Sequence, residues 1–180
     1  MKYNIPFKFL KNLPYKLNNF YKNKSNLSYK VDNKSKTIKD FDPVTNLDRS
    51  FEKYIRLLIH KSFPNDSIIG EEFEDKFSSN DYQWCIDPID GTRAFIIGAP
   101  TWSNLIGLSF QNKSIIGLAN FPELNKYYIS NQKKAYLFKN NKKFNLKSSS
   151  NNNLKTIKII GNFHGTLSYE KQKKIIKKFG

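Results

Sequence analysis

Residues 84–92 read Trp84-Cys85-Ile86-Asp87-Pro88-Ile89-Asp90-Gly91-Thr92. The apolar start predicts a buried strand, which would carry Asp87 and Asp90 to its exposed end. Pro88 fixes one backbone angle between the two carboxylates, and Gly91 lets the backbone come close to a ligand. Two carboxylates beside free backbone amides suit Mg²⁺ together with a phosphate group. The same residues also suit a plain turn between a strand and a helix, so this stretch alone leaves both interpretations open.

Two further acidic segments lie upstream of this stretch. They are Asp42-Pro43-Val44-Thr45-Asn46-Leu47-Asp48 and Gly70-Glu71-Glu72. Each segment falls at the expected end of a helix or strand, so the three ends can meet at one edge of a sheet. Carboxylates that converge there would repel each other unless cations lay between them. The three segments together therefore predict a site for a divalent metal.

Hydrophobic spacing predicts an α+β fold in which N-terminal helices pack on an antiparallel β-sheet. Helices are expected over 1–24, with a candidate kink at Pro14, and over 47–63, where Thr45 and Asp48 have the spacing of a capping box. Besides the opening stretch, the remaining expected elements are strands at 27–31, 67–70, 103–110, 114–121, 126–130, 134–138 and 156–160, turns at 111–113 and 139–143, and a helix over 166–179. No repeat or linker divides residues 1–180, so we expect a single domain.

The chain carries a formal net charge of +16, but its cations are dispersed lysines, and arginine occurs only at positions 49, 56 and 93. A protein that reads nucleic acid more often concentrates Arg and aromatic residues in one patch. We therefore expect no specific nucleic-acid partner, although a positive field favours a phosphorylated substrate. No apolar run approaches the roughly 18 residues of a membrane span, and the N-terminus lacks the apolar centre of a secretion signal. The single Cys85 excludes an internal disulfide and is expected in the core. These features predict a cytoplasmic protein.

The three acidic segments resemble the motifs of the inositol monophosphatase family of Mg²⁺-dependent, lithium-sensitive phosphatases. The matching pieces are D-P-V-T-x-x-D at 42–48, G-E-E at 70–72 and D-P-I-D-G-T at 87–92. The residues that follow, with D-G-T-R-A-F, G-x-P-x-W and Leu105-Ile106-Gly107-Leu108, are more similar to the histidinol-phosphatase branch. The resemblance covers roughly residues 35–160 and implies a layered α+β phosphatase fold.

The resemblance also implies roles for particular residues. The implied Mg²⁺ ligands are Glu71, Asp87, the Ile89 carbonyl and Asp90. The implied contacts to phosphate and substrate come from Asp90, Gly91, Thr92 and Arg93. Glu71 and Thr92 would orient the attacking water. Thr45 and Asp48 would in turn orient these residues without contacting the metal themselves.

Several residues keep a simpler interpretation beside the catalytic one. Thr45 and Asp48 are expected to cap a helix in any case. Glu72 can be a solvated charge, and Arg93 can pair with an acid instead of contacting substrate. His60 and His164 are expected to be structural or exposed, since neither has a second ligand nearby in the sequence.

The sequence departs from the family pattern in two places. Members of the family are longer, and their later half supplies a W-D-x-A-A-G motif whose aspartate completes the second metal site; this motif does not occur here. Leu47 also replaces the small residue that is usual before the motif's aspartate. We therefore expect a truncated chain that exposes apolar surface, binds Mg²⁺ weakly and turns over little substrate.

Three functions stay open from the sequence. The first is hydrolysis of histidinol phosphate by a Mg²⁺-dependent phosphomonoesterase, and the second is the same chemistry on inositol monophosphate. The third is a non-catalytic module that acts through its basic surface. Because the family commonly forms dimers, a homodimer is expected for a full-length form.

Overall fold

The computed structural model describes residues 4–24, 30–34 and 43–150, together with positions 153, 156, 168, 170–171 and 173–174. The chain divides into two compact units, Met1–Leu146 and Lys147–Gly180. In the second unit, positions 170–171 and 173–174 are helical, and the Lys171 amide donates to the Ser168 hydroxyl (3.5 Å), as at a helix start. The predicted strand at 156–160 lies outside the described residues except for Thr156, which is in a turn. His164 and most of the predicted helix at 166–179 also lie outside them.

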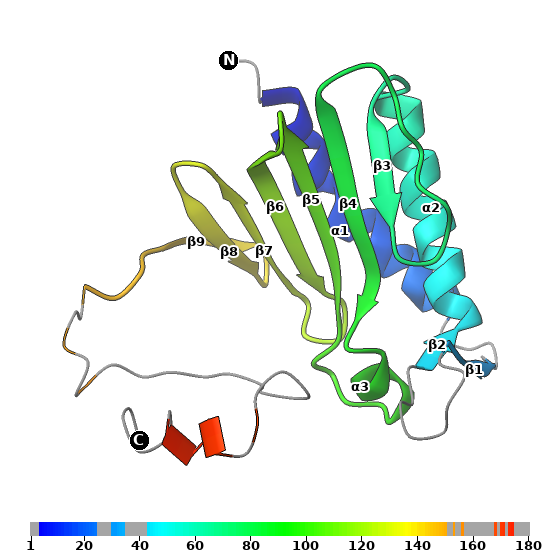
Figure 1. The fold of residues 1–180 in the computed structure, drawn as a ribbon. Helices are drawn as coiled ribbons and strands as arrows, with labels where there is room; N and C mark the ends of the chain where they lie inside the picture. Colours follow the sequence, from blue (N-terminus) through cyan, green and yellow to red (C-terminus); the bar gives the residue numbers. More distant parts are fainter. Residues whose placement is uncertain are drawn as a thin grey trace. The chain divides into compact units, whose positions relative to one another are not determined.

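The first unit contains three helices and nine strands in its described part (Figure 1). Their bounds are α1 Asn4–Lys24, β1 Val31–Asn33, β2 Pro43–Thr45, α2 Asn46–Ser62, β3 Ser67–Gly70, β4 Tyr82–Asp90, α3 Thr92–Ile96, β5 Ser103–Phe110, β6 Lys113–Phe121, β7 Lys126–Asn131, β8 Ala135–Lys139 and β9 Lys142–Leu146. Helices and a sheet in one unit confirm the predicted α+β class.

Seven strands form one sheet in the order β3-β4-β5-β6-β7-β8-β9, and β1 pairs with β2 separately. The prediction of an antiparallel sheet was wrong at one edge, because β3 and β4 run parallel, with Ser67 opposite Gln83 and Gly70 opposite Ile86. The loop 71–81 carries the chain back to the edge of the sheet at which β3 begins, so that β4 can run parallel to β3. A tight hairpin would make the two strands antiparallel. As a result, β3 and β4 end at the same edge of the sheet.

Helices α1 and α2 pack on one face of this sheet (Figure 1). Helix α1 buries Leu10, Leu13 and Leu17, and it continues through Pro14. Helix α2 buries a stripe that includes Phe51 and Ile55. This spacing is that of an amphipathic helix on a core. Within the described residues, no helix is long and apolar enough to cross a membrane.

Among the hairpin turns with a left-handed backbone, one matches the sequence-based expectation and another explains a difference from it. Gln111 and Asn112 have positive φ angles of 50° and 60°, and they form the turn predicted between β5 and β6. Asn140 and Asn141 adopt the same left-handed backbone, which Asn tolerates better than most residues. This turn is shorter than the predicted 139–143, so residues 142–146 are free to form β9, which was not predicted.

Candidate active site

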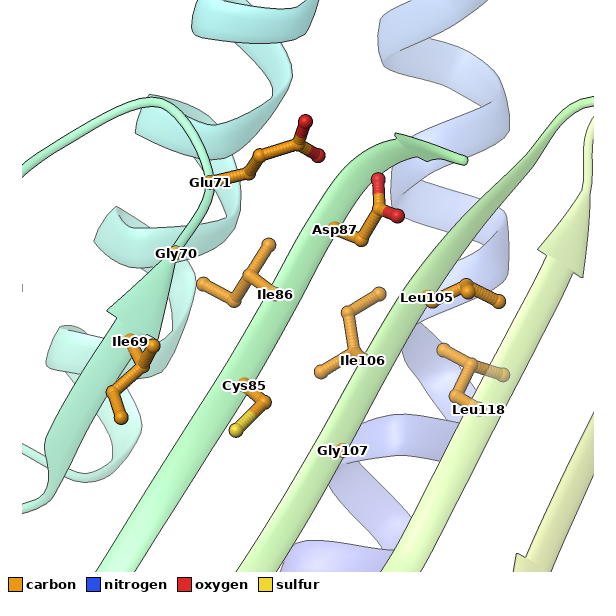
Figure 2. Close-up of a pocket in the computed structure, with 10 residues that line it drawn as sticks. All are labelled: Ile69, Gly70, Glu71, Cys85, Ile86, Asp87, Leu105, Ile106, Gly107 and Leu118. Atoms are coloured by element: carbon orange, nitrogen blue, oxygen red, sulfur yellow. The ribbon is translucent and has the colours of Figure 1, made fainter. Parts of the chain in front are cut away.

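The ends of β3 and β4 bring two of the predicted acids together. Glu71 directly follows β3, and Asp87 lies in β4 just past the last register pair with β3. Figure 2 shows the Glu71 carboxylate extending toward that of Asp87. The parallel pairing is the cause, because both strands carry their carboxyl ends to one edge.

Helix α2 supplies an acid that the sequence interpretation missed. Glu52 is fully buried, and its carboxylate accepts from Arg56 Nε (2.8 Å) and from the Glu72 backbone amide (2.7 Å). A Cβ added at Gly70 would lie 2.0 Å from Glu52 Oε1, so only glycine admits this close approach. Glu52 therefore fixes the turn that presents Glu71. Its position in the sequence could have indicated this role, because Glu52 lies on the apolar face of α2 together with Ile55 and Ile59.

Lys34 bridges the two acids of the G-E-E segment. Its ammonium nitrogen lies 2.8 Å from Glu71 Oε1 and 2.5 Å from Glu72 Oε1. The Glu72 side chain is only 3% exposed, so the interpretation of Glu72 as a solvated charge was wrong. Burial opposes the charged ammonium, but the bonds to Glu71 and Glu72 outweigh it and raise the pKa of Lys34. Lys34 thus offsets part of the repulsion among the acids.

Thr45 and Asp48 form the predicted capping box at the start of α2. The Thr45 hydroxyl accepts from the Leu47 and Asp48 amides, and Asp48 Oδ2 accepts from the Thr45 amide (2.8 Å) and from the Thr45 hydroxyl. Both residues are buried. The other Asp48 oxygen accepts from the Thr92 hydroxyl at 3.4 Å, and this hydroxyl also lies 3.0 Å from the Ile89 carbonyl. The cap therefore connects to the D-P-I-D-G-T segment.

The residues after Asp87 occupy an irregular turn into α3. Asp90 is exposed, and its carboxylate accepts from the Ser103 hydroxyl at 3.2 Å. Gly91 has a φ of 83°, a left-handed conformation that strains other residues. Arg93 is exposed on α3, a helix that was not predicted. Asp90, Gly91, Thr92 and Arg93 therefore lie in succession at the entry to α3, where Thr92 bonds to Asp48.

Electrostatics single out Asp87 among these acids. Burial, followed by the charges of Glu71 and Asp90, raises its pKa from 3.8 to about 7. Its Oδ1 atom is buried and has no hydrogen-bond partner among the described residues. Burial also raises the pKa of Asp48 and of Glu72, partly offset by the Thr45 bonds and by Lys34, respectively. A buried carboxylate oxygen without a donor, facing other acids, is one that a cation would stabilise.

This electrostatic arrangement predicts a particular pH dependence of stability. A carboxyl whose pKa is higher in the folded chain than in the unfolded chain destabilises the folded state once it ionises. Asp87 should therefore cost stability as the pH rises from about 4 to about 7. We expect the metal-free chain to lose about 1–2 kcal/mol more between pH 5 and pH 7.5 than the Asp87→Asn variant loses, after allowance for partial exposure. Urea unfolding of both proteins at the two pH values checks this, and equal losses would contradict it.

The sequence profile of the inositol monophosphatase family matches residues 16–178 of this chain. The chain belongs to the inositol monophosphatase family. The matched range contains the acids that the structure brings together, from Asp48 to Asp90.

Known relatives and solved structures of this family are similar to the chain. A histidinol-phosphatase of Chlorobaculum parvum is 44% identical over 90 residues, which are 50% of this chain and 35% of that enzyme. The extragenic suppressor protein suhB of Bartonella henselae shares the fold, with a TM-score of 0.65 and 24% identity over 84% of this chain and 56% of that one. An IMPase/NADP phosphatase solved with Mg²⁺ and phosphate has a TM-score of 0.64 and 17% identity, over 72% of this chain and 49% of that one. The aligned part of this chain thus spans about a third of the length of the histidinol-phosphatase.

A metal ion needs ligands of suitable chemistry that are grouped closely in space. In the part of the chain that the structure describes, no three His, Cys, Asp or Glu side chains are grouped so that they could hold one ion. The donors themselves fit, because Glu71, Asp87 and Asp90 supply the hard oxygen atoms that Mg²⁺ prefers. The unpartnered Oδ1 of Asp87 is the clearest vacant acceptor. Glu71, Asp87 and Asp90 therefore have the donor chemistry of a Mg²⁺ site and interact through their charges, but their side chains are not gathered around one point.

A pocket of this chain lies directly beside Glu71 and Asp87 (Figure 2). Its volume is about 510 Å³, and it is lined by Ile69, Gly70, Glu71, Cys85, Ile86, Asp87, Leu105, Ile106, Gly107 and Leu118. Cys85 is exposed there, because it alternates with the buried Trp84 and Ile86 along β4. The expectation of Cys85 in the core was therefore wrong: the apolar run suggested a strand covered on both faces.

Proposed function

We propose that this chain carries the catalytic acids of a Mg²⁺-dependent phosphomonoesterase that acts on a small phosphorylated molecule. The observation that carries the proposal is the approach of Glu71 to Asp87, whose buried Oδ1 lacks a donor and whose pKa the charges of Glu71 and Asp90 help to raise. Membership of a phosphatase family and the solved Mg²⁺ and phosphate complex of a structural neighbour support it. Glu71, Asp87, the Ile89 carbonyl and Asp90 are the proposed ligands. Bound Mg²⁺ would lower the pKa of a water and neutralise the leaving oxygen.

The chain's own groups have clear tasks in such a reaction. Thr92 donates its single hydroxyl proton to Ile89 or Asp48, so its oxygen can still accept a hydrogen bond from a water. Glu71 is 46% exposed, and its carboxylate can take a proton from that water. Gly91 and Thr92 amides, with Arg93, would contact the phosphate. Thr45 and Asp48 hold Thr92 from the buried side, which limits its rotation.

Histidinol phosphate is the substrate that we propose. The 44% identity to a histidinol-phosphatase supports it, as does the net charge of +16, which attracts phosphorylated molecules. A homodimer of a longer form and the lack of a specific nucleic-acid partner stay predictions.

A Mg²⁺ titration with two substrates tests the proposal. We expect Mg²⁺ to raise the melting temperature and to support slow hydrolysis of histidinol phosphate, at least about tenfold faster than that of inositol 1-phosphate, because a site built for one substrate's polar groups rejects the other. Phosphate release, with EDTA as the metal-free control, measures this. Absence of any Mg²⁺ effect on melting or hydrolysis would contradict the proposed function, and a preference for inositol 1-phosphate would contradict the substrate alone.

A further inference from the structure

The strand pairing is irregular where the two aspartates of β4 lie. Asp87 pairs with Leu105 and Asp90 pairs with Ser103, so two residues of β4 face the single residue Asn104 of β5. Such a bulge leaves backbone groups of the longer strand without their ladder partners. The Asn104 side chain supplies one of them: its Nδ2 donates to the Pro88 carbonyl at 2.6 Å, and Asn104 is fully buried.

A second buried amide orients Asn104. Asn120 of β6 lies directly opposite Asn104 in the sheet register, and it too is fully buried. Its Nδ2 donates to Asn104 Oδ1 (2.9 Å) and to Asn18 Oδ1 on α1 (2.9 Å). Because a side-chain amide has one acceptor end and one donor end, this contact commits Asn104 to present its NH₂ group to Pro88.

Asn104 and Asn120 are fully buried, where apolar side chains would stabilise the fold more, and Asn18 is half-buried. Buried amides cost free energy unless every polar atom has a partner, and Asn120 Oδ1 has none in the described part of the chain. The neighbouring buried positions of the same strands, Ile106 and Leu118, are apolar. The three amides link α1 through two strands to one carbonyl, which lies between Asp87 and Asp90. A device that fixes this carbonyl accounts for the polar residues, whereas a need for stability does not.

We propose that Asn18, Asn120 and Asn104 form a positioning relay that holds the Pro88 carbonyl and thereby sets the placement of Asp87 and Asp90 for a divalent cation. The inference rests on the proposed function, and it adds residues that lie outside the acidic motifs. Asn104 acts on the bulge, Asn120 sets the orientation of Asn104, and Asn18 ties Asn120 to α1. Effects on the cation should therefore decrease in that order along the relay.

Binding of Mn²⁺, measured by the electron paramagnetic resonance signal of the free ion, tests the relay independently of activity. We expect Asn104→Leu, which matches the volume but lacks the donor, to weaken Mn²⁺ binding about 10–100-fold, as for other groups that orient metal ligands. Asn120→Leu should weaken it about 3–10-fold, and Asn18→Ala less than threefold. Binding is measured at a temperature where circular dichroism shows each variant fully folded.

Ile129→Ala is the matched control, because Ile129 is a buried residue of β7 without a hydrogen bond to the relay. Ile129→Ala should lower the melting temperature but leave Mn²⁺ affinity unchanged. If Asn104 had only a structural role, Asn104→Leu would behave in the same way. Parent-like affinity in Asn104→Leu, while the parent binds Mn²⁺, would overturn the relay alone. If Asn104→Leu does not fold, parent-like affinity in Asn120→Leu overturns it. Absence of Mn²⁺ binding by the parent chain would overturn both the relay and the proposed function.

Discussion

Replacing Asp87 with asparagine should reduce Mg²⁺-dependent phosphate release by about 100-fold or more, since metal binding and catalysis depend strongly on ligand charge. The substitution keeps the side chain's shape but removes the charge that the cation would neutralise. The Mg²⁺-induced rise in melting temperature should disappear with it. Phosphate release and thermal unfolding, each with and without Mg²⁺, measure the two effects.

The same variant should be more stable than the parent when metal is absent. At pH 7.5 the parent holds an ionised or partly ionised Asp87 against Glu71 and Asp90, and asparagine ends this repulsion. A gain in metal-free stability combined with a loss of Mg²⁺ response is difficult to explain for an ordinary turn residue. Asp75→Asn serves as the control, because Asp75 is an exposed acid of the loop 71–81. If both variants behaved alike, Asp87 would have no special role.

Replacing Glu52 with alanine should cost about 3 kcal/mol of stability or more, the usual penalty for breaking a buried ion pair. The change removes the carboxylate partner of Arg56, whose side chain is only 17% exposed and keeps only its bond to the Phe73 carbonyl, and it leaves the Glu72 amide without its acceptor. Because this amide anchors the turn that carries Glu71, the Mg²⁺ response should weaken too. Urea unfolding gives the first effect, and a Mg²⁺ titration of the melting temperature gives the second.

Two further substitutions separate the charge of Glu52 from its contacts. Glu52→Gln keeps an acceptor for the Glu72 amide, so it should lose about half as much stability. Gly70→Ala should disturb the same pair from the opposite side, because its Cβ would lie 2.7 Å from Arg56 Nη2 as well as 2.0 Å from Glu52 Oε1. Gly107→Ala is its control, since an added Cβ there meets nothing within 4 Å. Equal stability of Gly70→Ala and Gly107→Ala would show that the Glu52–Arg56 pair tolerates displacement.

Local sequence patterns predicted the parts of this fold that depend on local physics. The capping box at Thr45 and Asp48 and the bounds of β5 follow from side-chain spacing, and both are as predicted. The convergence of Glu71 with Asp87 was also foreseen, since each lies at an element end. Where the sequence interpretation failed, a partner distant in the chain decides the outcome. The parallel pairing of β3 and β4 is one example.

The residues that support the site were harder to predict than the acids themselves. Glu52 resembles an ordinary helix acid until the Glu72 amide, 20 residues away, is placed against it. Asn104 lies in an apolar run, and its partner carbonyl at Pro88 is left without a strand partner by a bulge that no local sequence pattern predicts. Cys85 was misplaced because an apolar run does not reveal which face of a sheet is covered. These three errors concern tertiary contacts, whereas the missed α3 and β9 are errors of secondary structure.

The position of Cys85 gives the chain a built-in attachment point for a spectroscopic reporter. It is the single cysteine of the sequence, it is exposed, and it lies on the same face of β4 as Asp87, two residues away. Burial and the charge of Asp75 raise the pKa of its thiol, so labelling should proceed best in mildly alkaline buffer. A nitroxide attached there would sense a paramagnetic ion near Asp87 through dipolar broadening, without any engineered residue.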